Sequence, residues 1–369
     1  MDLNMHMIIP DLPQKTKNVH IEKNLSMFAR FGVVSHPMDN RELLTEDMSG
    51  YDAVYMNWFE NIDGGAFYMP VLRFIRRKIQ LQRMKKAGIK IIFCKHNRFP
   101  HDPRYRRLSK NLYLQLLDMA DVIIAFTGDA EKDLQEVFPR RDFSCKIHAI
   151  LPVNYIGAYR PKPDSHIYKR LDPFKGKLVI GFIGRILPYK NAELIIKAAK
   201  ESEDRDMAFF IAGEPASKEY QAKLDAMAAG SKNLITLFER LPDEEIYPAL
   251  DVSDALIMPY DTKSASNSGA GRLAFSYGKT VISSDISSMN LIPEELIYKY
   301  HYDSADCHYE KMMEQIGKMY SDWKANPNVL AEKGERLLAL MEKDYSEAAI
   351  QKKYEEVFMG LKADRNREV

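Results

Sequence analysis

The chain has 369 residues, which at roughly 150 residues per domain predicts about two domains. Apolar residues make up 46% and charged residues 28%, a composition that excludes a mainly disordered, collagenous or fibrous chain. The formal net charge is only +1, which by itself gives no sign of an electrostatic partner.

The chain shows no membrane-spanning or disulfide-rich pattern. No apolar run approaches the roughly 18–20 residues that a spanning helix needs, and the first residues lack the apolar region of a secretory signal. The three cysteines, Cys94, Cys145 and Cys307, lie far apart, which excludes a disulfide framework and a CxxC metal site. We therefore expect a cytoplasmic protein without a metal site or a cofactor.

The first half of the chain alternates short β-rich runs with longer amphipathic stretches. The expected strands cover residues 5–10, 51–58, 89–96, 121–127 and 146–151. This alternation is typical of βα units that form a parallel sheet.

A strongly basic segment interrupts this pattern. Residues 71–110 hold fourteen Lys or Arg and one acid, Asp102, a net +13, so the rest of the chain carries −12 to give the total of +1. A helix is predicted from near Pro70 to Gly88, with an apolar stripe and basic residues over the rest. Such a surface is either a solvated helix face over a domain core or a patch for an anionic membrane or acceptor; no nucleic-acid-binding motif accompanies it. The patch is expected to include Arg73, Arg76, Arg77, Lys85 and Lys86.

The second half repeats the alternation after a Pro- and Tyr-rich segment. Its expected strands cover residues 177–184, 207–214, 233–239, 254–260 and 279–285. We predict an α/β protein with two doubly wound, Rossmann-like domains that face each other across a cleft. The predicted domains are residues 1–155 and 177–345, with a linker at 156–176 and a final helix, 346–369, that packs back on the first domain.

Residues 181–200 carry the most informative motif. A strand ends at Gly184, a short loop brings Arg185 and Lys190, and a helix begins near Asn191. Two cations beside a helix N-terminus suit a diphosphate, although loop cations in solvent are the simpler interpretation. A second candidate is the glycine-rich helix start at Ser268 and Gly269, where backbone amides could approach phosphate oxygens.

These segments resemble the donor domain of GT-B glycosyltransferases of the family 4 type. The resemblance is carried by GFIGRILPYKNAELIIKAA, MAFFIAGEP, NLITLFERLPDEEIYPALDVSDALIMPY and GKTVISSD. More loosely, NWFEN and KHNRFPHD are similar to strand-end motifs of bacterial exopolysaccharide and capsule enzymes. The resemblance implies that Arg185 and Lys190 hold a donor diphosphate, that Glu214 and Pro242 lie in loops around the sugar and base, and that Ser268 and Gly269 bind diphosphate.

The sequence departs from that family at two places. The positions of the paired glutamates fall on Ala265 and Leu273, which cannot ionise. The glycine-rich loop that the family has after its first strand is also missing. The contacts to the donor sugar and the retention of anomeric configuration are therefore not implied here.

An inverting transfer needs a general base near the acceptor hydroxyl. In the first half, the carboxylates and imidazoles that follow strands are Glu60, His96, Asp102 and Asp11. Glu60, His96 and Asp102 rank equally as candidates, because each also has a structural interpretation as a capping, hydrogen-bonded or ion-paired residue.

The sequence thus predicts a metal-independent GT-B hexosyltransferase. It is expected to move a sugar from a UDP- or GDP-sugar to a glycan acceptor, with a lipid-linked acceptor favoured, in surface polysaccharide assembly at the inner face of the cell membrane. The alternatives are a sugar-nucleotide epimerase or hydrolase on the same scaffold, a non-catalytic subunit that binds nucleotide sugar, and, least favoured, a nicotinamide-dependent oxidoreductase suggested by GAGRLA at 269–274.

Overall fold

The computed structural model divides into two compact units, and each unit is built on one sheet. Unit 1 comprises residues 1–153 and 345–369, and unit 2 comprises residues 154–344. The structure describes residues 3–10, 18–62, 67–96, 98 and 105–368, with the side chains of 364–368 left aside.

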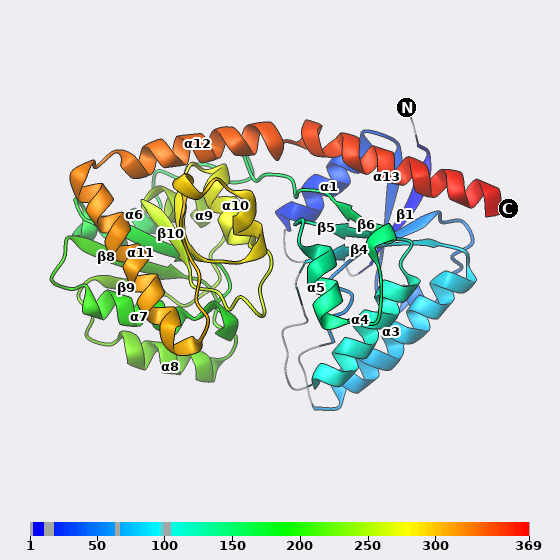
Figure 1. The fold of residues 1–369 in the computed structure, drawn as a ribbon, viewed down its shortest axis with the longest axis horizontal. Helices are drawn as coiled ribbons and strands as arrows, with labels where there is room; N and C mark the ends of the chain where they lie inside the picture. Colours follow the sequence, from blue (N-terminus) through cyan, green and yellow to red (C-terminus); the bar gives the residue numbers. More distant parts are fainter. Residues whose placement is uncertain (1–2, 11–17, 63–66, 97, 99–104, 369) are drawn as a thin grey trace. The chain divides into compact units, whose positions relative to one another are not determined.

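Unit 1 is a three-layer α/β/α unit (Figure 1). Its six strands are all parallel, in the order β2-β1-β3-β4-β5-β6. The strands are β1 (Met5–Pro10), β2 (Val33–Met38), β3 (Ala53–Asn57), β4 (Lys90–Lys95), β5 (Val122–Ala125) and β6 (Ile147–Ala149). The helices are α1 (Val19–Ala29), α2 (Glu42–Thr45), α3 (Met69–Lys86), α4 (Arg106–Met119), α5 (Ala130–Val137) and α13 (Glu347–Glu368).

The last helix belongs to unit 1, although most of that unit comes from the start of the chain. Helix α13 begins where Ser346 Oγ accepts the Ala349 N–H at 3.2 Å, an N-cap that satisfies one free helix donor. Its buried face packs against α1, with the rings of Phe28 and Phe358 5.1 Å apart. The Tyr354 hydroxyl lies 3.2 Å from that of Tyr55 on β3. Residues distant in sequence therefore share one core.

Unit 2 has the same plan. Its parallel strands run in the order β12-β11-β10-β7-β8-β9. The strands are β7 (Leu178–Ile183), β8 (Met207–Ala212), β9 (Leu234–Leu237), β10 (Ala255–Met258), β11 (Thr280–Ser284) and β12 (Tyr298–Tyr300). The helices are α6 (His166–Leu171), α7 (Ala192–Glu201), α8 (Lys218–Ala228), α9 (Asp243–Asp251), α10 (Gly269–Ser276), α11 (Ala305–Ala325) and α12 (Val329–Asp344).

The segment predicted as a linker, 156–176, is part of unit 2. It contains α6, and Ile167 and Phe174 are buried. The Tyr159 N–H donates to the Tyr277 hydroxyl at 2.7 Å, and Lys162 pairs with the buried Glu245 at 2.5 Å. These contacts hold the segment on the domain, so the boundary falls between residues 153 and 154 rather than across a free linker.

All ten expected strands are present, and two edge strands escaped prediction. Strand β2 reads VVSHPM, whose proline and polar residues are tolerated because the strand pairs on one side only. Strand β12 has only three residues, too few for a recognisable alternation.

Candidate functional site

Two glycines bring the ends of β7 and β8 into direct contact. Gly213 has φ +154°, and a Cβ placed there would lie 1.9 Å from the Gly184 carbonyl oxygen. Beyond the strands, the Ile186 N–H donates to the Glu214 carbonyl at 2.9 Å. Only glycine allows so close a backbone approach, which keeps the two following loops paired beyond the sheet.

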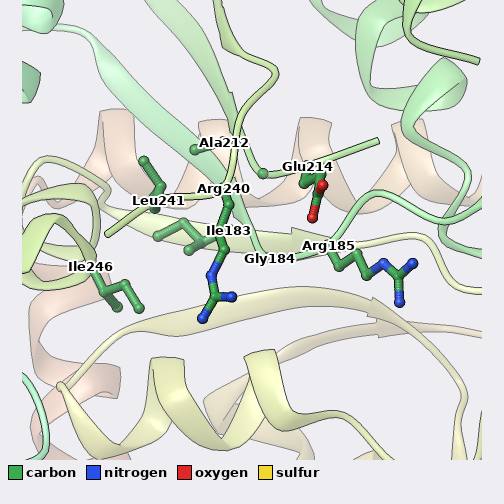
Figure 2. A pocket seen from close by; sticks show the side chains of 9 residues that line it. Ile183, Gly184, Arg185, Ala212, Glu214, Arg240, Leu241 and Ile246 are labelled. Carbon is green, nitrogen blue, oxygen red and sulfur yellow. The ribbon is translucent and has the colours of Figure 1, made fainter. Parts of the chain in front are cut away.

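A pocket of about 350 Å³ opens at this edge of the sheet (Figure 2). Each of three neighbouring strands is followed by one charged lining residue: Arg185 after β7, Glu214 after β8 and Arg240 after β9. The complete lining is Ile183, Gly184, Arg185, Ala212, Gly213, Glu214, Arg240, Leu241 and Ile246. Carboxyl ends of parallel strands are where doubly wound sheets bind ligands, so the pocket has the expected location for a substrate.

Only some of the predicted donor-binding residues line this pocket. Gly184, Arg185 and Glu214 line the pocket, whereas Pro242 stands just outside its lining, next to Leu241. Sequence reasoning missed Arg240, an exposed cation on the same edge. The available signal was its place shortly after an expected strand, in LITLFER.

Lys190 lies close to Arg185 but is half-buried. It ends the turn Pro188–Lys190, and its Nζ is 5.3 Å from the centre of the Tyr260 ring. Burial, with a further contribution from the Arg185 charge, lowers the pKa of Lys190 to about 8. The exposed Arg185 and the half-buried Lys190 repel each other, and a bound anion would relieve that repulsion.

The loop that carries Lys190 is anchored to the loop after β10. Asn191 adopts the left-handed conformation, φ +53°, and its side-chain amide donates to the Pro259 carbonyl at 2.8 Å. The Asp261 N–H donates to the Tyr189 carbonyl at 2.8 Å. A strained backbone held by hydrogen bonds on both sides fixes the Lys190 position and the start of α7.

The second predicted anion site is the N-terminus of α10. Ser268 caps the helix by accepting the Gly271 N–H at 3.0 Å, and Gly269 is the first helical residue. Ser268 and Gly269 do not line the pocket of Figure 2. The Ser268 hydroxyl donates to Met258 Sδ at 3.1 Å and lies close to the Tyr260 hydroxyl; the Tyr260 ring is beside Lys190, so the helix start and the lysine share one neighbour.

The positions of the absent glutamates are apolar and buried. Ala265 is 3% exposed and Leu273 8% exposed. Both side chains belong to the packing around α10, so this part of the site offers no carboxylate to a sugar.

In unit 1, His96 and Trp58 form a stacked pair at the carboxyl ends of β4 and β3. Their rings are 4.0 Å apart and nearly parallel, at 19°. Trp58 has φ +52°, a left-handed conformation that is strained for a bulky residue. His96 Nε2 lies 2.7 Å from Asn57 Oδ1, and because an amide oxygen accepts, Nε2 is the donor in this pair.

Glu60 has a different environment from His96. Its side chain is 3% exposed and lies near Cys94 and Tyr113 in the interior. Burial raises the pKa of the Cys94 thiol and of the Tyr113 hydroxyl, and the Glu60 charge adds to both effects. The third candidate base, Asp102, lies outside the described residues, as does Asp11.

The predicted basic patch needs one correction. Arg77 is 9% exposed, and its guanidinium packs 4.0 Å over the Phe59 ring, which removes it from the surface. Lys85 and Lys86 are exposed, and Arg73 and Arg76 are half-buried on the same helix. The predicted apolar stripe of α3 is largely exposed instead of facing the core.

The described residues form neither a metal-binding cluster nor a membrane-spanning helix. No group of three or more His, Cys, Asp or Glu side chains is arranged to hold a metal ion in the described part of the chain. None of its helices is both long and apolar enough to cross a membrane.

Comparison with known sequences matches residues 166–336 to the family described as glycosyl transferases group 1. A GDP-mannose:glycolipid 4-beta-D-mannosyltransferase from Xanthomonas campestris pv. campestris is 23% identical over 273 residues, covering 70% of each chain. A D-inositol 3-phosphate glycosyltransferase from Nocardia farcinica is 26% identical over 154 residues, 39% of this chain and 34% of the relative.

Solved structures match both units. Anabaena Alr3699/HepE in complex with UDP and glucose superimposes with a TM-score of 0.71 at 12% identity, over 96% of this chain and 100% of that one. Sucrose-phosphate synthase from Thermosynechococcus elongatus gives a TM-score of 0.72 at 12% identity, over 98% and 100%. Residues 166–336 therefore match the group 1 glycosyltransferases in sequence, and both units have the fold of these GT-B structures.

Proposed function

We propose that this enzyme transfers a hexose from a nucleoside diphosphate sugar to a lipid-linked glycan. The observation that carries the proposal is the cation pair Arg185 and Lys190, held beside a pocket at the carboxyl edge of the unit 2 sheet. A leaving diphosphate needs stabilised negative charge, and two preorganised cations with a helix N-terminus supply it without a metal ion. Arg240 adds a third positive charge on the same edge.

The proposed transfer inverts the anomeric carbon. The acceptor oxygen forms a bond to that carbon, the bond to the diphosphate oxygen breaks, and its electron pair leaves with the nucleoside diphosphate. The acceptor proton passes to a base in unit 1, for which we favour His96 because its ring directly follows β4 and stacks on Trp58 at the carboxyl ends of the strands. Buried Ala265 and Leu273 support this stereochemistry, since neither can act as a carboxylate.

The relatives suggest which donor and acceptor to examine first. The Xanthomonas relative is named for GDP-mannose and a glycolipid, and it covers 70% of this chain. We therefore propose a GDP-sugar donor ahead of a UDP-sugar, and a glycolipid acceptor in surface polysaccharide assembly. Such an acceptor places the enzyme at the inner face of the cell membrane as a peripheral protein.

Binding and turnover test these assignments separately. GDP, UDP, TDP and CMP should be compared by thermal shift, in which the cognate nucleotide raises Tm by mass action. Arg185→Ala and Lys190→Ala should each lower transfer by about 10²-fold, the scale for one lost charge stabiliser. Wild-type turnover in both variants would refute the diphosphate assignment.

The base is tested by a variant that spares donor binding. His96→Gln should abolish transfer while leaving the nucleotide-induced Tm shift intact, and Glu60→Gln is its comparison. Conversion of a nucleotide sugar in the absence of any acceptor would instead indicate an epimerase or hydrolase.

A further inference from the structure

Helix α3, with the two residues just before it, exposes an apolar surface. Six of the nine large hydrophobic residues exposed in the described part of the chain lie there or just before it. They are Phe67, Tyr68, Val71, Leu72, Ile75 and Ile79, exposed by 41–83%. Single exposed hydrophobic residues are ordinary on a protein surface, whereas a cluster of six marks a binding face.

The opposite face of the same helix is unusually polar for a buried face. It presents Pro70, Arg77, Gln80, Leu81 and Met84 to the core. Gln80 is fully buried and donates to the Asn40 carbonyl at 2.9 Å, and Arg77 stacks on Phe59. Because α3 buries an arginine and a glutamine and leaves leucine and isoleucine outside, its outer face is not explained by the folding of unit 1 alone.

The two helices next to this apolar surface carry many positive charges. Helices α3 and α4 pack side by side (Figure 1), and the Tyr105 hydroxyl donates to the Phe67 carbonyl at 2.6 Å where both helices begin. Helix α3 contains no acidic residue. The exposed or half-buried cations of the two helices are Arg73, Arg76, Lys78, Arg83, Lys85, Lys86, Arg106, Arg107 and Lys110.

We propose that this surface, the α3–α4 face, docks on an anionic lipid bilayer by inserting its apolar ridge between the headgroups. An apolar ridge beside lysine and arginine, on a helix that contains no acid, matches the interface of a membrane with negative headgroups. A protein partner of ordinary composition would not require six exposed or half-buried cations and no acid on the docking helix. The acceptor part of this inference rests on the proposed function, while the docking itself does not.

The position of the face fits a lipid-linked acceptor. In a βα unit the helix that follows a strand begins near that strand's carboxyl end, so α3 and α4 begin near the ends of β3 and β4. His96 and Trp58 lie at those same strand ends. A bilayer on this face would therefore hold a lipid-linked glycan close to the proposed base.

Vesicle co-sedimentation of the full-length enzyme tests the docking. Wild type should bind phosphatidylcholine vesicles containing phosphatidylglycerol and bind pure phosphatidylcholine much more weakly. The double variant Leu72→Ser/Ile75→Ser should lose about tenfold or more in partitioning, because two exposed apolar side chains no longer insert. Val34→Ser, which changes a residue 45% exposed on β2, is the matched control and should bind like wild type.

Charge variants test the electrostatic part. Arg106→Gln/Arg107→Gln/Lys110→Gln should lower partitioning by about 100-fold, close to fivefold for each charge. Lys352→Gln/Lys353→Gln, at exposed positions on α13, should have no such effect. Equal binding to neutral and anionic vesicles, or unchanged binding of the double apolar variant, would overturn the proposal.

Two further measurements separate lipid docking from self-association and from donor binding. Sedimentation velocity without lipid should show the same oligomeric state for wild type and Leu72→Ser/Ile75→Ser; a dimer lost in the variant would assign the face to a second copy and overturn lipid docking. The face variants should also keep the wild-type Tm shift with nucleotide. Vesicle binding without any nucleotide binding would leave docking standing while refuting the proposed donor.

Discussion

Raising the pH from 7 to 9 should weaken nucleoside diphosphate binding through the loss of one proton from Lys190. Burial and the Arg185 charge lower the pKa of Lys190 to about 8, so the side chain is about 90% charged at pH 7 and about 10% charged at pH 9. A neutral amine offers the diphosphate no charge. The Kd for GDP or UDP should therefore be nearly constant below pH 7 and approach a tenfold rise per pH unit above pH 8.

The free energy of unfolding should rise with pH over the range in which nucleotide binding weakens. The folded-state pKa of Lys190 lies below the ordinary 10.5, so between pH 8 and 10.5 the unfolded chain holds the extra proton and the free energy of unfolding rises with pH. At pH 7 the charged, half-buried Lys190 lowers the free energy of unfolding of the folded protein. Lys190→Met should remove that cost and stabilise the protein by up to about 3 kcal/mol, while weakening nucleotide binding.

The assay is isothermal titration calorimetry with GDP and UDP from pH 6.5 to 9, combined with chemical denaturation at the same pH values. Lys190→Met should give a flat pH profile, and Lys200→Met, which changes an exposed lysine at the far end of α7, should keep the wild-type profile. A variant lacking Lys190 that retains the wild-type affinity and the same pH dependence would refute the reasoning.

Three further changes should have measurable effects. Arg185→Gln should move the rise in Kd to higher pH, because the Arg185 charge contributes to the lowered pKa of Lys190; an unmoved midpoint in the same titration would contradict this. Gly213→Ala places a Cβ 1.9 Å from the Gly184 carbonyl, so it should lower Tm and abolish nucleotide binding, and crystals showing an unshifted loop would disprove the contact. Phe358→Ala should cost about 3–5 kcal/mol in urea unfolding, since a fully buried ring in the unit 1 core is lost, and a change below 1 kcal/mol would contradict that packing.

The sequence predicted the layout of the fold because strands buried on both faces have a strong local signal. Runs such as Leu178–Ile183 are continuously apolar and bounded by glycines or charges. The edge strand Val33–Met38 has no such signal, because half of its residues are polar or proline. Its pairing with β1 holds it in the sheet.

The sequence pattern predicted where α3 begins and ends, but not which face of the helix packs against the core. Pro70 and Gly88 correctly bounded the helix, and the apolar spacing was recognised. Which stripe faces the core depends on tertiary partners, such as Phe59 under Arg77. The fold can therefore bury a cation and expose an isoleucine when a partner for the cation is available inside.

The sequence predicted only some residues of the candidate site, for a similar reason. Arg185 and Lys190 follow a recognisable strand and loop within a few residues. Arg240 joins them through the pairing of β8 with β9, a contact in space that no local pattern encodes. The strain at Trp58 is equally invisible, because the left-handed conformation of a tryptophan results from its packing.

The return of α13 to the first unit has a consequence for synthesis on the ribosome. Residues 154–344 form a unit that needs no later part of the chain, whereas the unit that begins the chain lacks one helix of its core until the last residues emerge. The second unit can thus complete folding before the first. During that interval Phe28 and its neighbours on α1 lack their covering helix, which leaves apolar surface of the nascent first unit exposed to water.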